Sequence, residues 1–116
     1  MDGESPEFEH TANEMSRHLF DAVNQIQELK ELRTDAFAKA EVHMREMARL
    51  LKGREQLPRS VLKQLHMAAG IFENEAPYAK DEVATVAMAN AVRITLGFIL
   101  WGQCHDDYTP GAPRIV

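Results

Sequence analysis

Apolar side chains recur every three or four residues along most of the chain, the spacing of helices with one buried face. Residues 7–52 contain neither glycine nor proline and are rich in strong helix formers. In their first half the apolar positions alternate steps of four and three residues, which is a heptad repeat. We call these positions the N-terminal seam: Phe8, Ala12, Met15, Leu19, Ala22, Ile26 and Leu29. The pattern predicts an amphipathic helix that packs along this seam.

The apolar repeat changes phase at residues 33–35, where Thr34 or Asp35 is suited to cap a new helix. An unbroken helix over 7–52 would be about 69 Å long, whereas a compact domain of about 100 residues has a radius of gyration near 13 Å. We therefore expect the region to break or bend near 33–35 and fold back. The alternative is a straight helix that projects and has its seam covered by a second chain.

Two further helices are expected. Pro58 suits the first turn of a helix over residues 58–75, and Asp81 can cap a helix over residues 81–103. No run alternates in strand fashion, so the fold class is all-α: a small four-helix bundle-like domain. Residues 1–6 are expected to be a flexible N-terminus.

We expect residues 105–116 to form a non-helical, extended C-terminal tail, because Pro110, Gly111 and Pro113 oppose a helix. We expect Tyr108 and Ile115 to pack back onto the bundle.

The stretch 83–102 is long and apolar enough to cross a bilayer. However, Asn90 and Arg93 lie in its middle, and a central arginine costs about 2.5 to 3.5 kcal/mol on insertion scales. Alanine is its commonest residue, which suits close helix packing better than lipid. We expect a central helix buried on most of its circumference, with Arg93 reaching the edge or a carboxylate.

The composition of the chain indicates the class of protein and the cellular compartment. The chain has 116 residues, 45% of them hydrophobic and 27% charged, with a formal charge of −5. These values indicate one globular domain and disfavour disorder and polyanionic partners. The single cysteine excludes an internal disulfide, and the acidic N-terminus lacks the pattern of a signal peptide. A cytoplasmic location is the simplest interpretation.

Histidines and acids fall at helical spacing in three pairs, each sharing one helix face. The pairs are Glu7 with His10, Glu14 with His18, and His43 with Glu46. Such units bind metals in di-iron bundles, but the inward positions beside them are apolar. We therefore expect surface histidines beside solvated acids, and no metal or cofactor.

Catalytic patterns are weak. Cys104 is followed by His105, Asp106 and Asp107, but adjacent residues at a helix end seldom face each other as a nucleophile and its base must. Glycine loops for phosphate and the common hydrolase signatures are missing. We expect no catalytic residue and no enzyme.

Four bases concentrate around one loop and the start of the third helix: Lys52, Arg54, Arg59 and Lys63. They could dock an anion or a nucleic acid. The favoured interpretation is a solvated loop that compensates the acidic helices. The methionines likewise suit core filling better than an adaptable protein-binding groove.

The leading functional hypothesis is a small protein-binding module that uses an acidic helical surface against a basic partner. The expected binding residues are Glu14, Asp21, Glu28, Glu31 and Asp35. An inhibitor, immunity protein or antitoxin is a concrete version, and a homodimer through the N-terminal seam is a further expectation. The alternatives are a metal-binding helical-bundle enzyme and an anion- or nucleic-acid-binding protein that uses Lys52–Lys63.

Overall fold

The computed structural model describes residues 5–107, and within that range it contains four α-helices and no strand. The α-helices are α1 (Pro6–Leu29), α2 (Thr34–Leu51), α3 (Arg59–Glu75) and α4 (Glu82–Leu100). Two short 3-10 turns follow α3 and α4: η1 (Ala76–Tyr78) and η2 (His105–Asp107). The predicted all-α, four-helix fold is confirmed.

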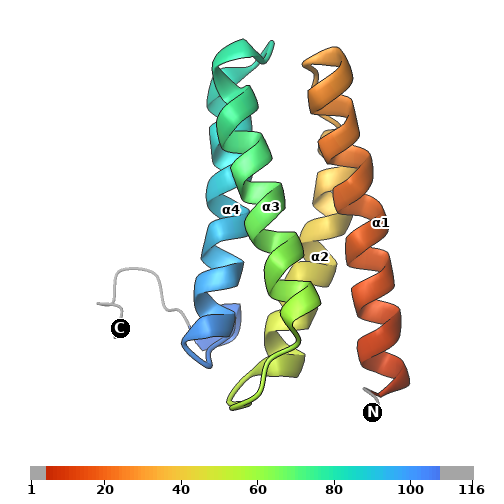
Figure 1. Cartoon of the computed structure of the whole chain (residues 1–116), viewed down its shortest axis with the longest axis vertical. Coiled ribbons are helices and arrows are strands. Elements are labelled where there is room, and N and C mark those ends of the chain that lie inside the picture. Colours follow the sequence, from red (N-terminus) through yellow and green to blue (C-terminus); the bar gives the residue numbers. More distant parts are fainter. Residues whose placement is uncertain (1–4, 108–116) are drawn as a thin grey trace.

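The helices form two hairpins that lie side by side. Helix α1 packs mainly on α2 and α3 mainly on α4, while α1–α3 and α2–α4 contacts join the hairpins. Figure 1 shows that α1 and α3 run in one direction and α2 and α4 in the other. One core of buried apolar side chains therefore holds the bundle together.

The long helical region breaks and folds back, as predicted, although the break lies slightly before residues 33–35. Helix α1 ends at Leu29, and Lys30 adopts the left-handed conformation with φ 58°. Helix α2 then begins at Thr34. The Lys30 carbonyl accepts a 2.9 Å hydrogen bond from the Lys80 amide, and the Lys30 ammonium lies 2.7 Å from Glu75. The turn is thus fixed by contacts with the α3–α4 hairpin.

Most of the N-terminal seam is buried inside the chain, but Leu29 at its end is 54% exposed. Phe8, Met15, Leu19, Ala22 and Ile26 are all buried in the core, most of them completely. The fold-back supplies helices of the same chain to cover these side chains. The expected homodimer through the seam stays a prediction.

Helix α4 begins and ends close to the predicted positions. The Asp81 carboxylate accepts a 3.0 Å hydrogen bond from the Ala84 amide, which caps the first turn. The helix ends at Leu100, and Gly102 follows with φ 72°, a left-handed conformation that glycine adopts readily. The helix is therefore shorter than the expected 81–103.

Helix α4 is not buried on most of its circumference, which corrects the sequence expectation. Val83, Val86 and Ile94 are 81%, 41% and 44% exposed, because α4 packs on α2, α3 and η1 and its outer side has no neighbour among the described residues. By length and composition alone α4 could cross a membrane, but core helices of soluble proteins pass the same test. Arg93 makes the expected carboxylate contact: two hydrogen bonds of 2.8 Å to Glu73.

Both ends differ in detail from the expected segments. Pro6 already belongs to α1, whose first turn is capped by the Ser5 hydroxyl, so part of the expected flexible segment 1–6 is helical. Residues 105–107 form η2 and are not extended. The expected contacts of Tyr108 and Ile115 lie outside the described residues.

Candidate functional site

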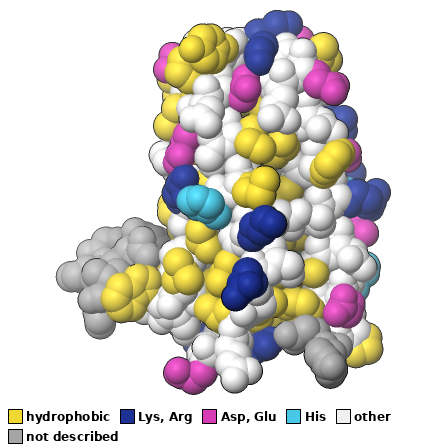
Figure 2. Space-filling model, in the orientation of Figure 1, with side chains coloured by type: hydrophobic (Ala, Val, Ile, Leu, Met, Phe, Trp, Pro, Cys, Tyr) yellow, Lys and Arg dark blue, Asp and Glu magenta, His cyan; other side chains and the backbone are white. Residues whose placement is uncertain are grey.

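A groove runs between α1 and α3. It consists of two hollows of about 450 and 410 Å³, which meet at Ser60 and Gln64. The apolar hollow is lined by Leu19, Phe20, Val23, Met67, Ala68 and Ile71, with Asn24, Gln27, Ser60, Lys63 and Gln64 at its edges. Figure 2 shows hydrophobic side chains along this face of the bundle, with lysine and arginine between them. We call this feature the α1–α3 groove.

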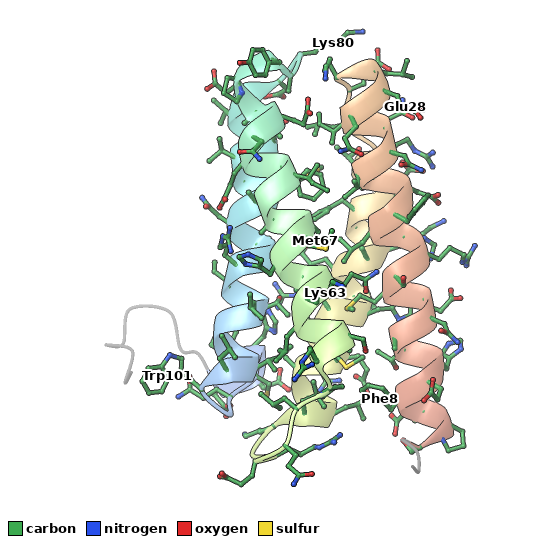
Figure 3. The ribbon with its side chains drawn as sticks, in the orientation of Figure 1. Phe8, Glu28, Lys63, Met67, Lys80 and Trp101 are labelled. Carbon is green, nitrogen blue, oxygen red and sulfur yellow. The ribbon has the colours of Figure 1, made fainter. Side chains whose placement is uncertain are left out.

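Two large apolar side chains of the α1–α3 groove are open to solvent. Phe20 is 62% exposed and Met67 is 53% exposed. Figure 3 shows Met67 one turn beyond Lys63 on the exposed face of α3. Met15, Met44, Met47 and Met88 are buried, as the core-filling interpretation expects. Met67 is different, because it offers a flexible thioether to solvent beside an aromatic ring.

A hydrogen bond crosses the groove where its two hollows meet. The Gln64 amide donates to the Ser16 hydroxyl at 2.6 Å. This contact joins α1 to α3 at mid-length, and the second hollow continues from it toward Phe8 and Pro58. The groove therefore extends along much of α1.

The five acidic residues expected to bind a partner are divided by the structure. Asp21 and Glu28 are exposed on α1, and their spacing of seven residues places them on one side of the helix. Glu14 lies 2.8 Å from Arg17, and this hydrogen bond lowers the pKa of Glu14.

The other two expected acids have close basic partners. Glu31 lies 2.5 Å from Lys80, which lowers the pKa of Glu31. Asp35 accepts two hydrogen bonds from Arg33, which lower the pKa of Asp35 to about 2. Local bases thus neutralise part of the acidic surface, while Asp21 and Glu28 are exposed on α1.

The structure does not gather the four expected anion-binding bases into one site. Lys52 lies 2.7 Å from Asp107, while Arg54 is exposed in the loop before α3. Arg59 is exposed at the first residue of α3, and Lys63 lines the α1–α3 groove. These bases serve different local contacts.

A histidine and glutamate cluster lies on the other side of α1, against α2. The ligand atoms of Glu14, His18 and His43 all lie within 4.8 Å of one another. His18 is buried, with 9% exposure, so the expectation of surface histidines is wrong for this residue. The reason is that His18 flanks the seam and the α1–α2 hairpin covers it. Burial also lowers the pKa of His43, which favours the neutral imidazole.

His10 borders the same cluster. Its ring centroid lies 6.3 Å from that of His43, and the His18 and His43 rings are nearly parallel at 6.0 Å. Beside His10 and His43 is a hollow of about 450 Å³, which also contacts Glu7 and Glu46. The three sequence pairs of histidine and acid therefore converge on one region of the α1–α2 interface.

Cys104 and His105 are held by contacts within the fold. Cys104 is buried, and its amide donates to the Asp107 carboxylate at 2.9 Å. The His105 imidazole lies 3.1 Å from the Thr95 hydroxyl, and its ring is tilted against that of Phe98 with centroids 4.8 Å apart. The imidazole is thus engaged with α4.

Sequence reasoning missed the α1–α3 groove. A signal existed, because Phe20 and Val23 form a second apolar row beside the N-terminal seam, and Met67 and Ile71 do the same on α3. Each row is short, and only the helix packing shows that the rows face each other. Comparisons of the chain with protein-family models, with curated proteins and with solved structures find no match.

Proposed function

We propose that this chain is a protein-binding module whose α1–α3 groove holds one amphipathic helix of a basic partner protein. The observation that carries the proposal is the apolar hollow with the exposed Phe20 and Met67 on its two sides. Large apolar side chains at a concave surface are typical of helix-in-groove recognition. Aromatic and methionine side chains are also enriched at protein interfaces.

The length of the groove suits one helix of moderate size. Its hollows contact α1 from Phe8 to Gln27, a distance of about 28 Å at 1.5 Å per residue. A partner helix of about five turns has that length. The Ser16–Gln64 hydrogen bond at mid-length requires a small side chain on the partner at that point.

The charge of the chain favours a basic partner. The formal charge is −5, and Asp21 and Glu28 are exposed on α1, the helix that forms one side of the groove. Opposite charges speed encounter and orient the partner. Lys63 on α3 gives the other edge a positive charge, which fixes the direction in which an asymmetric partner helix can bind.

An inhibitor, immunity or antitoxin protein of the cytoplasm is one form of such a non-enzymatic module, and it is the form we propose. Proteins that act on nucleic acids carry basic surfaces, and an acidic module with an apolar groove can cover such a surface. Charge and groove shape together support this choice of partner class.

The test combines capture with groove variants. Wild-type protein is used to capture partners from the native host, and the captured protein is then titrated in pure form. The groove variant is the double substitution Phe20→Ser and Met67→Ser. The matched control is Val42→Ser, since Val42 is 64% exposed on α2, outside the α1–α3 groove.

We expect one stoichiometric basic protein that binds wild type and the Val42→Ser control equally. The double groove variant should bind it at least about tenfold more weakly, because the few residues that dominate an interface each contribute about 2 kcal/mol or more. Equal binding by the groove variant, or capture of no basic protein, would contradict the proposal.

A further inference from the structure

Three side chains on α1 that are able to bind a metal ion are spaced so that they share one face of the helix. His10, Glu14 and His18 follow one another at intervals of four residues, so they lie on one side of the helix, one turn apart. After the break at Lys30 the chain runs back as α2, which brings His43 close to Glu14 and His18. Two antiparallel helices therefore supply ligands to one point.

The donor groups are close and partly shielded from water. His18 Nε2 lies 3.6 Å from Glu14 Oε1, which is longer than a hydrogen bond. The side chains of His18 and Glu14 are only 11% and 27% exposed. The two groups are thus near each other, while the same Glu14 oxygen accepts a 2.8 Å hydrogen bond from Arg17.

We propose that Glu14, His18 and His43 bind a divalent transition-metal ion of the zinc class between α1 and α2, with His10 as the fourth ligand. Two or three imidazole nitrogens with one carboxylate oxygen suit zinc and its neighbours, whereas magnesium and calcium require oxygen ligands. The site lies on the side of α1 away from the α1–α3 groove, so this inference is independent of the proposed function.

Small side-chain movements complete the coordination geometry. Tetrahedral ligands at zinc distances are about 3.4 Å apart, while the three ligand atoms lie within 4.8 Å of one another. Binding therefore requires rotations about the side-chain bonds of His18 and His43, and His10, whose ring centroid lies 6.3 Å from that of His43, must turn toward them. Glu14 must also leave Arg17, whose side chain is 63% exposed and free to turn toward solvent.

The test is a metal titration of tag-free, chelator-treated protein. Cobalt(II) is the first probe, because its visible absorption reports coordination number and donor type, and zinc(II) is then added in competition. The ligand variants are His18→Gln, His43→Gln and Glu14→Gln. The control is His66→Gln, because His66 is an exposed histidine that contacts Arg93 near α4.

We expect one cobalt ion per chain in a four-coordinate site, displaced by zinc. Each ligand variant should bind at least about tenfold more weakly, since losing even a group that orients a ligand costs about 10- to 100-fold. The His66→Gln control should match wild type. Circular dichroism of each metal-free variant establishes that it is folded, and the less buried Glu14 and His43 sites decide the result if His18→Gln unfolds.

Three results would overturn the inference. One is the absence of saturable binding at one ion per chain. Another is unchanged affinity in folded His43→Gln and Glu14→Gln proteins. The third is a cobalt–thiolate charge-transfer band, which would place the ion at Cys104.

Discussion

At the scale of single residues, the ends of the helices show which local signals can be interpreted from sequence. Asp81 caps α4 as expected, because an acidic side chain beside free amide groups acts within one turn. Lys30 could not be identified in this way. A left-handed residue other than glycine costs about 1 to 2 kcal/mol, and here distant contacts with Glu75 and Lys80 hold it in place.

His105 makes the stability of the bundle sensitive to acid. Burial lowers the pKa of His105, and the positive charges of Arg45 and Arg49 lower it further, while Asp106 opposes them. Its Nε2 faces the Thr95 hydroxyl, and its Nδ1 is buried without a partner. An unfolded chain therefore takes up a proton near the ordinary histidine value of 6.5, whereas the folded chain takes it up only at lower pH.

The sign of the effect follows from this difference. Below about pH 7 the unfolded state binds more protons than the folded state, so the free energy of unfolding falls as the pH falls toward the lowered pKa of His105. We expect His105→Gln to reduce this fall, because the glutamine amide takes up no proton in this pH range. The amide can still form a hydrogen bond to Thr95. Urea unfolding of both proteins between pH 7.5 and 5 measures it. An identical pH dependence in both would mean that His105 is not the source.

At the scale of the elements, the amphipathic helices could be interpreted from sequence more fully than the apolar one. The N-terminal seam marks the buried side of α1 because polar residues occupy most of the other positions, apart from the short row with Phe20 and Val23. Helix α4 is apolar over most of its surface, so its pattern does not distinguish a covered side from an open one. Only the arrangement of α2 and α3 shows that Ile94 and Trp101 lie on the open side.

The exposed side of α4 leads to a contrast between two neighbouring substitutions. Ile94→Lys should change the free energy of unfolding by no more than about 0.5 kcal/mol, because surface substitutions rarely exceed this. Val92 is completely buried two residues away, and Val92→Lys should cost several kcal/mol because it buries a charge without a partner. Chemical denaturation of both variants tests this. A large loss for Ile94→Lys would show that another surface covers this side.

At the scale of the whole molecule, periodicity and chain length were sufficient to predict four helices and a fold-back. The sites were harder to predict, because they depend on which residues of different helices face each other. His18 and His43 meet only in the register that the α1–α2 hairpin adopts, and Phe20 and Met67 line one groove only because α1 lies beside α3. No local pattern encodes these two relations.

A pair of aromatic rings joins the two hairpins in the core. Phe72 of α3 is completely buried and meets Phe37 of α2 edge to face, with ring centroids 5.8 Å apart. Phe72→Ala should reduce the free energy of unfolding by about 3 to 5 kcal/mol. That is a large share of the total of about 5 to 15 kcal/mol that is typical of a domain.

The matched variant is Phe20→Ala, which removes the same atoms from a side chain that is 62% exposed. It should cost no more than about 0.5 kcal/mol, and urea denaturation monitored by circular dichroism compares the two. Equal losses would mean that Phe20 is covered in solution, and the α1–α3 groove would then be occupied by the chain itself. A large loss for Phe72 alone would leave the groove open, as a module that binds another protein requires.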